Sequence, residues 1–161
     1  KNVTKTYIGI DNGVTGTVSI ITTSDVIHFH IPVQKELSYT KKKQYITRID
    51  YNKLIQALDN YGNCFCLLER PMINPMRWKA SMSAIRALEA TLISLERLAI
   101  PYQYIDSREW QKELLPKNLF KNKGKDLKFA ALDIAKRLFP QINTKDADSL
   151  LIAEYARRKG L

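Results

Sequence analysis

The N-terminal part of the chain alternates between apolar segments and tight turns, and this pattern constrains the fold more than any other feature. Residues 7–11 form an apolar run typical of a buried strand, and residues 12–16 carry the signals of a tight turn. Residues 17–22 are rich in β-branched side chains, and residues 26–33 alternate in hydropathy after a second short turn. Three strands joined by such short turns form an antiparallel meander, so the chain is expected to begin as a β-sheet.

The remaining sequence adds helices and two further strands. Residues 34–50 are polar, basic and without periodicity, which predicts a loop. Apolar segments over 64–68 and 102–105 are expected to be strands. Helices are expected over 51–60, 79–99, 107–115, 126–139 and 145–159. The order βββ-α-β-α-β-α-α-α predicts an α/β fold, with helices on both faces of a mixed five-stranded sheet, in a single domain spanning 1–161.

The chain is strongly basic. It holds 26 Lys+Arg against 16 Asp+Glu, a net charge of +10, and the bases concentrate in residues 35–48 and 108–137. This excess indicates a polyanionic partner, although charge alone does not identify a reaction. The longest apolar runs are only a few residues, so no membrane partner is expected. Cys64 and Cys66 lie in an apolar stretch and are expected to be buried free thiols in a reducing cytoplasm.

A few acids occupy unusual positions in this basic chain. Asp11 and Glu69 each end an apolar strand, where a charge is costly unless it is paired or bound to a metal. Side chains at the carboxyl ends of neighbouring strands can project into one crevice. The alternatives are that Asp11 stabilises the following turn and that Glu69 pairs with Arg70.

The last predicted helix supplies two more acids. Asp148 shares a helical face with the apolar Leu151 and Ile152, so it is not expected to be a solvated surface charge. Asp146 lies about 200° away around a regular helix, so the two acids do not share a face if both are helical. Asp146 is therefore either a second acid of the crevice or a carboxylate that favours the helix N-terminus.

Carboxylates without a nearby histidine favour Mg²⁺, or Mn²⁺ in its place, over zinc. His28 and His30 alternate along the third strand and are expected to be surface residues. Two such ions per site activate a water molecule and stabilise the leaving oxygen in phosphodiester hydrolysis, while the basic surface holds the nucleic-acid backbone.

Three segments that carry these acids resemble the acidic motifs of RuvC-type Holliday junction resolvases, in order and spacing over nearly the whole chain. They are residues 8–16 (IGIDNGVTG), 68–71 (LERP) and 146–153 (DADSLLIA). The resemblance implies a ribonuclease H-like fold and a homodimeric, Mg²⁺-dependent endonuclease that nicks two strands of a four-way DNA junction symmetrically, in recombination, repair or phage DNA processing. Residues 64–92 resemble the phage and prophage branch, which implies the cytoplasm of a bacterial cell or a phage-infected host.

The resemblance also implies residue roles. Asp11, Glu69 and Asp148 match the metal-binding acids of the family. The family places an Asp, His or Glu about three residues before the last Asp, where this chain has Lys145, and Asp146 is the nearest acid. Lys128 matches a lysine that contacts the cleaved phosphate region, and Lys112 matches a second lysine. The expected catalytic set is Asp11, Glu69, Asp146, Asp148 and Lys128.

Two segments outside the crevice are expected to face DNA. Residues 72–79 are apolar but interrupted by Pro75, which predicts a loop that separates base pairs at the crossover, with Trp78 as the first wedge candidate and Met72 as the second. The alternative is that Trp78 anchors a helix start in the core. The basic run at 41–43 is either a DNA contact or a solvated loop. The expected DNA-binding residues are Lys41, Lys42, Lys43, Met72, Arg77, Trp78, Lys79, Lys112, Lys125 and Lys128.

Other functions remain open at this point. Residues 9–16 also resemble the phosphate-binding hairpin of the actin and sugar-kinase superfamily, which needs two such domains, and 161 residues are too few for both. A branched-DNA-binding protein with a degenerate site, a broader branched-DNA nuclease and a nuclease for RNA–DNA hybrids are the remaining alternatives.

Overall fold

A five-stranded mixed sheet organises the protein, as the sequence predicts. The computed structural model describes residues 4–121 and 125–161. The strand order is β3-β2-β1-β6-β7, in which β1, β2 and β3 are antiparallel while β6 and β7 run parallel to β1. These strands are β1 (Thr6–Asp11), β2 (Thr17–Ile21), β3 (Val26–His30), β6 (Cys64–Glu69) and β7 (Tyr102–Ile105).

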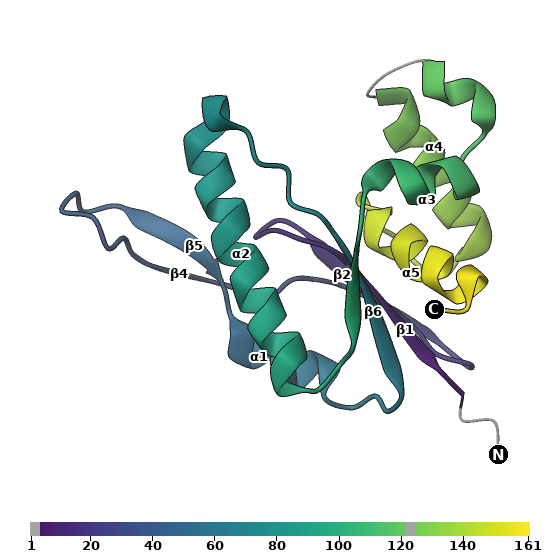
Figure 1. The fold of residues 1–161 in the computed structure, drawn as a ribbon, viewed down its shortest axis with the longest axis horizontal. Helices are drawn as coiled ribbons and strands as arrows, with labels where there is room; N and C mark the ends of the chain where they lie inside the picture. Colours follow the sequence, from purple (N-terminus) through teal and green to yellow (C-terminus); the bar gives the residue numbers. More distant parts are fainter. Residues whose placement is uncertain (1–3, 122–124) are drawn as a thin grey trace.

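Helices cover both faces of this sheet (Figure 1). Ile8 and Ile10 of β1 pack with Leu68 of β6 on the face covered by α1 (Tyr51–Leu58) and α2 (Trp78–Arg97). The alternate positions, such as Phe65 and Leu67, face the other way, where α3 (Ser107–Leu114), α4 (Lys125–Leu138) and α5 (Asp148–Lys159) complete a second core. This second side of the sheet is called the α5 face below. Because side chains alternate along a strand, each odd-numbered residue of β1 and β6 lies on the α5 face.

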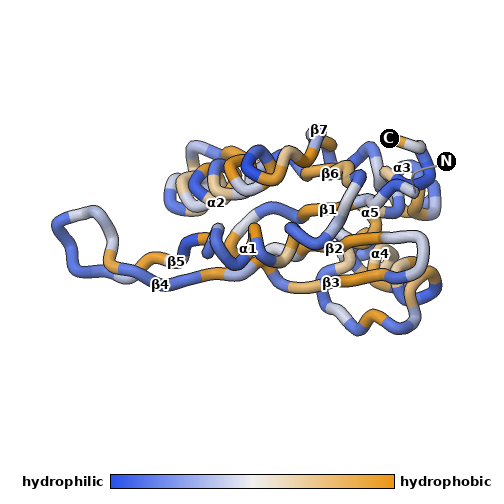
Figure 2. The backbone as a smooth tube through the Cα atoms, turned by 90° about the horizontal axis from the view of Figure 1, so that it is seen from below, coloured by the Kyte–Doolittle hydropathy of each residue, from blue (hydrophilic) through white to orange (hydrophobic). Residues whose placement is uncertain are grey.

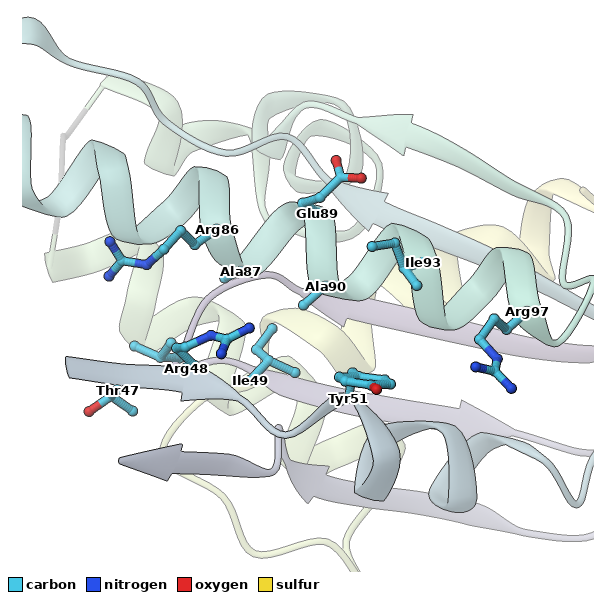
Figure 3. A pocket seen from close by; sticks show the side chains of 11 residues that line it. Thr47, Arg48, Ile49, Tyr51, Arg86, Ala87, Glu89, Ala90, Ile93 and Arg97 are labelled. Atoms are coloured by element: carbon cyan, nitrogen blue, oxygen red, sulfur yellow. The ribbon is translucent and has the colours of Figure 1, made fainter. Parts of the chain in front are cut away.

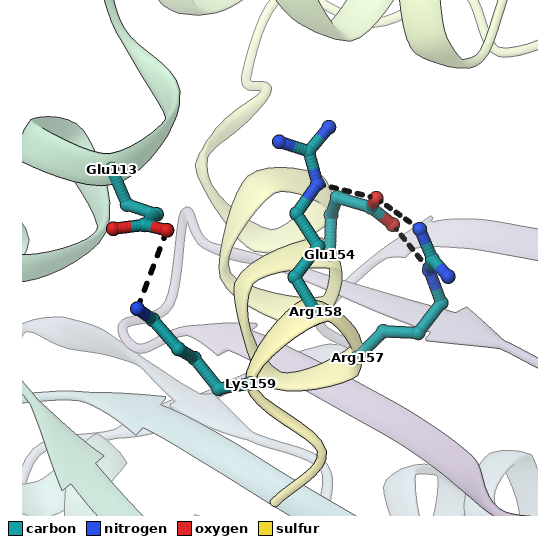
Figure 4. Close-up of polar contacts among 5 residues, drawn as sticks. All are labelled: Glu113, Glu154, Arg157, Arg158 and Lys159. Atoms are coloured by element: carbon teal, nitrogen blue, oxygen red, sulfur yellow. Dashed lines mark hydrogen bonds and ion pairs between the residues drawn. The ribbon is translucent and has the colours of Figure 1, made fainter.

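Helix α5 lies very close to β1 because β1 has a glycine where the two meet. A Cβ atom on Gly9 would overlap the Ser149 carbonyl oxygen and the Ala153 amide nitrogen. At the C-terminal end of α5, Lys159 Nζ lies 3.3 Å from Glu113 Oε1 of α3, and further ion pairs form within α5 itself (Figure 4). There the buried Glu154 carboxylate accepts two hydrogen bonds from Arg157, at 2.8 and 2.6 Å, and one from Arg158 at 2.9 Å. The helix that carries Asp148 is therefore packed closely on β1 near its start and ion-paired with α3 at its end.

The segment predicted as a loop over 34–50 is instead a β-hairpin, and that prediction is wrong. Strands β4 (Val33–Leu37) and β5 (Tyr45–Ile49) form a separate two-stranded antiparallel sheet. The hairpin projects from the body of the molecule (Figure 1), and its tip is mostly hydrophilic (Figure 2). Glu36 and Arg48 form an ion pair of 2.6 Å across it. Since neither face of this ribbon is covered near its tip, it shows none of the hydropathy alternation that marks a half-buried strand.

Several predicted boundaries also shift. The third strand ends at His30, and a 3₁₀ turn, Pro75–Arg77, precedes α2 within the segment predicted as a loop. Another 3₁₀ turn, Lys117–Lys121, lies between the helices predicted over 107–115 and 126–139. Cys64 and Cys66 are buried and free, as predicted. Within the described ranges, 4–121 and 125–161, none of the helices combines the length and apolar character needed to cross a bilayer.

Candidate functional site

The register of the central strands brings Asp11 and Glu69 together. Ile10 of β1 pairs with Leu68 of β6 in the parallel ladder, so the next residue of each strand lies at the same carboxyl edge. Both are odd-numbered positions, like Gly9 and Leu67, and therefore point to the α5 face. The two acids that end the apolar strands thus project toward the start of α5.

Asp148 completes this arrangement as the first residue of α5. One carboxylate oxygen from each of Asp11, Glu69 and Asp148 lies within 4.8 Å of the others. Asp146 precedes the helix, because α5 starts three residues later than predicted. Its Oδ1 accepts a hydrogen bond from the Asp148 amide at 3.2 Å, and its Oδ2 accepts one from the Thr17 hydroxyl at 3.1 Å. Asp146 therefore supports the helix start and still belongs to the acid cluster, defined here as Asp11, Glu69, Asp146 and Asp148.

Crowding of these carboxylates disfavours their charged forms. Burial, followed by the neighbouring Asp146 carboxylate, raises the pKa of Asp11 to about 10. Burial and the charge of Asp148 raise the pKa of Glu69 to about 7. Burial and Asp146 raise the pKa of Asp148 to about 6, while the Lys128 ammonium opposes this shift. At neutral pH the cluster is thus poised to exchange bound protons for a cation.

The donor set of the acid cluster fits a hard divalent cation. It offers oxygen ligands only, and the spacing of Asp11, Glu69 and Asp148 permits simultaneous contact of these three with one ion. The pKa values of these acids are raised first by burial and then by repulsion between the carboxylates, and a positive charge at the cluster would offset both effects. Asp11, Glu69 and Asp148 are the residues that would hold a metal, with Asp146 beside them.

Two cavities flank the acid cluster and meet at Asp11, Ser107 and Asp148, which line both. One, of about 620 Å³, is lined by Arg108 and Lys128 from α3 and α4. The other, of about 570 Å³, includes Asn12, Glu69, Arg70 and Met72 among its lining residues. The acids therefore lie between two open spaces, with cations on both sides.

The exposed segment before α2 lies at the second cavity. Met72 is 87% exposed and Trp78 is 68% exposed, so the alternative in which Trp78 anchors a helix in the core is wrong. Arg77 and Lys79 are exposed beside it. Trp78 is the first residue of α2, so it stands on a rigid element and not on a free loop.

The remaining predicted DNA-binding lysines are more widely spread. Lys41, Lys42 and Lys43 are exposed in the turn of the β4–β5 hairpin. Lys128 lines the first cavity, whereas Lys112, though exposed, lines neither cavity beside the acids. Lys125 is the first residue of α4, and its side chain lies outside the described part of the structure.

A buried polar network lies behind Asp146, and it was not predicted from the sequence. Thr17 and Ser19 face the acid cluster from β2, and His28 faces it from β3. His28 is only partly exposed, and its ring nitrogens contact Ser19 and Thr144, so its prediction as a surface residue is wrong, whereas His30 is exposed. Burial lowers the pKa of His28. The signal that could have revealed it is the alternation of polar residues along β2 and β3. Thr17, Ser19 and His28 lie on the face of the sheet that also carries Asp11.

A further cavity, of about 510 Å³, lies on the opposite side, between the base of the hairpin and α2 (Figure 3). Ala87, Ala90 and Ile93 give its α2 wall an apolar character, and Arg86 and Glu89 lie on the same helix. The Arg86 Nε atom is buried with no acceptor among the described residues. This face of α2 thus combines an apolar wall, on which Ile93 is exposed, with opposite charges one turn apart.

Comparison with solved structures agrees with the fold predicted from the acidic motifs. RuvC of T. thermophilus in complex with a Holliday junction substrate superposes with a TM-score of 0.63 at 13% identity, over 96% of this chain and 96% of that chain. A second Thermus thermophilus RuvC structure gives a TM-score of 0.57 at 14% identity, with the same coverage of both chains. No protein-family model and no curated protein matches the sequence. The chain has the ribonuclease H-like fold of the RuvC Holliday junction resolvases.

Proposed function

We propose that the protein is a metal-dependent endonuclease that cuts four-way DNA junctions by paired, symmetric phosphodiester hydrolysis. The observation that carries this proposal is the acid cluster at the carboxyl ends of β1 and β6, set between cation-lined cavities on the fold of a junction resolvase. Converging carboxylates with raised pKa values, lying beside cavities, are typical of functional sites.

The roles of the residues follow from their positions. Asp11, Glu69 and Asp148, assisted by Asp146, hold Mg²⁺, with two ions per site and Mn²⁺ as a substitute. When bound, such ions lower the pKa of a water molecule and stabilise the leaving oxygen. Lys128 is close enough to influence the charge of Asp148, so it is suited to hold the phosphate beside the cluster. Arg108, in the same cavity, serves the neighbouring phosphate.

The wider DNA path runs over the exposed cations and aromatic groups. The side chains suited to insert at the junction crossover are Trp78, which is flanked by Arg77 and Lys79, and the nearby Met72. Unpaired bases stack on an aromatic or apolar surface, and the flanking cations hold the phosphates beside them. Lys41, Lys42 and Lys43 extend the contact along a DNA arm, where they neutralise phosphates. Lys112 and Lys125 are proposed as outlying phosphate contacts on α3 and α4.

Paired nicks require two sites, and the α2 face is proposed as the contact of a homodimer. Ile85 and Ile93 are 47% and 41% exposed on this helix, an unusual solvent exposure for isoleucine. Arg86 and Glu89 carry opposite charges one turn apart, a self-complementary pattern suited to a two-fold axis.

Cleavage of synthetic substrates tests this function. End-labelled four-way junctions, three-way forks, linear duplexes and RNA–DNA hybrids of matched sequence are incubated with Mg²⁺, and the products are sized. We expect symmetric nicks in the four-way junction, with ligatable ends, and little cutting of duplex. Preferential cutting of the hybrid would instead support a hybrid nuclease, while tight junction binding without cutting in Mg²⁺ or Mn²⁺ would support a non-catalytic binding protein.

A further inference from the structure

We propose that His28 is a positioning residue for the acid cluster, acting on Asp146 through three buried hydroxyl groups. This inference rests on the proposed metal site but not on the identity of the nucleic-acid substrate. His28 lies on β3, two strands away from β1, and its hydrogen bonds within the described part of the chain go to hydroxyl groups and not to an acid. Its influence on Asp146 is carried by Ser19, Ser149 and Thr17, here called the hydroxyl chain.

The contacts along the hydroxyl chain are continuous and short. His28 Nδ1 lies 2.8 Å from Ser19 Oγ, which lies 2.7 Å from Ser149 Oγ. Ser149 Oγ lies 2.7 Å from Thr17 Oγ1, and Thr17 donates to Asp146 Oδ2 at 3.1 Å. Each step is within ordinary hydrogen-bond distance. The imidazole and the carboxylate are thus joined by four contacts through three hydroxyl groups, and a longer contact of 3.4 Å runs from Nδ1 directly to Ser149 Oγ.

Proton counting fixes the direction of this chain when Asp146 is ionised. Each hydroxyl has one proton to donate. Thr17 donates to Asp146, so Ser149 must donate to Thr17, and Ser19 must donate to Ser149. The fourth contact then needs a proton from the ring nitrogen, so Nδ1–H of His28 donates to Ser19. His28 therefore supplies the donor that orients every hydroxyl toward the carboxylate.

The other ring nitrogen reaches Asp146 by a second route. Nε2 lies 2.8 Å from Thr144 Oγ1. The Thr144 hydroxyl accepts from the Asp146 amide at 3.1 Å and lies 2.9 Å from the Asp146 carbonyl oxygen. When the neutral ring carries its proton on Nδ1, Nε2 is an acceptor, so the one Thr144 proton goes either to Nε2 or to that carbonyl oxygen. One nitrogen thus leads to the side chain of Asp146 and the other to its backbone. A single ring connects two β-strands with the segment that precedes α5.

Because the hydroxyl chain is buried, position 28 requires a side chain that can donate a hydrogen bond. Thr17, Ser19 and Ser149 are each 0% exposed. A buried hydroxyl group costs free energy unless it is hydrogen-bonded. Three linked buried hydroxyl groups therefore each need a partner, which restricts how they can be oriented. Without a donor at position 28, the chain has no group that forces Thr17 to point at Asp146. The expected result is a mobile Asp146 carboxylate and a weaker cation site.

The test compares three single variants in their affinity for Mn²⁺, measured by electron paramagnetic resonance of the free ion. His28→Phe keeps a ring of similar size but removes both polar nitrogens. His28→Asn retains a donor near the position of Nδ1 and is the conservative rescue. His30→Phe is the matched control, since His30 is exposed at the end of the same strand and lies outside the hydroxyl chain.

We expect His28→Phe to weaken Mn²⁺ binding by about 10- to 100-fold, the usual effect of removing a group that orients a metal ligand. The Asn variant should remain within about 3-fold of the parent, and His30→Phe should equal it. With junction DNA, kcat should fall while KM is preserved, because the DNA contacts are untouched. Unchanged Mn²⁺ affinity in a folded His28→Phe protein would overturn the proposal.

A second variant covers the case in which His28→Phe does not fold. Thr144→Val preserves the shape of the side chain but removes the hydroxyl between Nε2 and the Asp146 backbone. It should lower Mn²⁺ affinity without changing the circular dichroism spectrum, and parental affinity in this folded variant would then refute the proposal. Mn²⁺ binding that depends on His28 in a protein that cuts no junction would contradict the proposed function alone. A parent that binds no Mn²⁺ would contradict both.

Discussion

Asp11 illustrates how a residue of the proposed site can lower the stability of the folded protein. It ends a strand among apolar neighbours and faces three other carboxylates, so its ionised form is strongly disfavoured. The turn role considered for Asp11 from its sequence does not describe this setting, because its side chain faces Asp146, Glu69 and Asp148. Repulsion of this kind is removed when an acid is replaced by its amide.

The amide variants Asp11→Asn, Glu69→Gln and Asp148→Asn should therefore each lose junction cutting by about 1000-fold or more while retaining junction binding. In the absence of metal at about pH 8 the same variants should be more stable to unfolding by about 1 kcal/mol or more, since a tenfold change in the dissociation constant of an acid corresponds to about 1.4 kcal/mol. Gel-shift, cleavage and urea-denaturation assays measure these effects. Mg²⁺-dependent cutting retained by any of the three would remove that acid from the proposed site.

The raised pKa values also predict how stability and metal affinity vary with pH. Folding raises the pKa of Asp148 to about 6 and of Glu69 to about 7, so the folded protein binds more protons than the unfolded chain above about pH 4. Metal-free stability is therefore greatest below the unfolded values and falls as the pH rises through 6 and 7. Mg²⁺ competes with those protons, so its affinity should rise over the same range.

Thermal unfolding with and without saturating Mg²⁺ tests this linkage. The increase in Tm caused by Mg²⁺ should be larger at about pH 8 than at about pH 5. The Glu69→Gln variant, which cannot exchange that proton, should show a smaller dependence on pH. A Mg²⁺ effect that is equal at both values would contradict the proton exchange.

At the scale of elements, what could be predicted from the sequence depended on burial. The central strands were predictable because their apolar runs and turn residues directly reflect a buried sheet. Asp11 and Glu69 were predictable as site residues because each ends one of these strands. The β4–β5 hairpin was not, because Lys35, Leu37 and Tyr45 are all exposed and leave no alternating pattern. The sequence left Asp146 open between the crevice and the helix start, because its position depends on hydrogen bonds to Thr17 and to the Asp148 amide.

The hairpin is expected to contribute to affinity and not to catalysis. Replacing Lys41, Lys42 and Lys43 by alanine should weaken junction binding. It should also reduce the magnitude of the slope of log K against log salt concentration by about 2 to 3, since each phosphate neutralised by the protein contributes about 0.9. The cleavage rate of the fully bound complex should be unchanged. Binding measured over a salt series decides this, with Lys53→Ala on exposed α1 as a control, and an unchanged slope would place the hairpin away from DNA.

Packing of α5 on β1 gives a prediction about stability. Gly9→Ala should destabilise the fold by about 3 kcal/mol, because its Cβ would meet backbone atoms of Ser149 and Ala153 that cannot move independently of α5. Gly62→Ala is the matched control, since a Cβ there has no neighbour within 4 Å. Urea denaturation measures both variants. Equal stability of the two would show that α5 can move away from the sheet at little cost.

At the scale of the whole molecule, the sheet separates two surfaces with different proposed tasks. The α5 face carries the acid cluster, while the outer side of α2 carries exposed isoleucines and the cavity beside the hairpin base. Since these surfaces lie on different sides of the sheet (Figure 1), two copies could pair through α2 and still leave both acid clusters accessible to DNA.

A double variant of α2, Ile85→Glu with Ile93→Glu, should therefore convert a dimer into monomers, seen by analytical ultracentrifugation. The monomers should make single, unpaired nicks in a cruciform plasmid, because each nick needs only one site. Phe129→Glu on α4 is the control for oligomeric state, as Phe129 is 68% exposed but lies away from α2. A parent protein that is monomeric on a junction would refute the proposed dimer.

The alternation of side chains along β1 and β6 also limits how this chain can change in length. Removing one residue within either strand would turn its terminal carboxylate to the α2 side of the sheet, where no other acid of the cluster lies. Removing two would preserve the face but draw the carboxylate back along the strand by roughly 6 Å, a distance of about two residues. Insertions and deletions should therefore be confined to segments such as the β4–β5 hairpin, where length has no effect on which way Asp11 and Glu69 point.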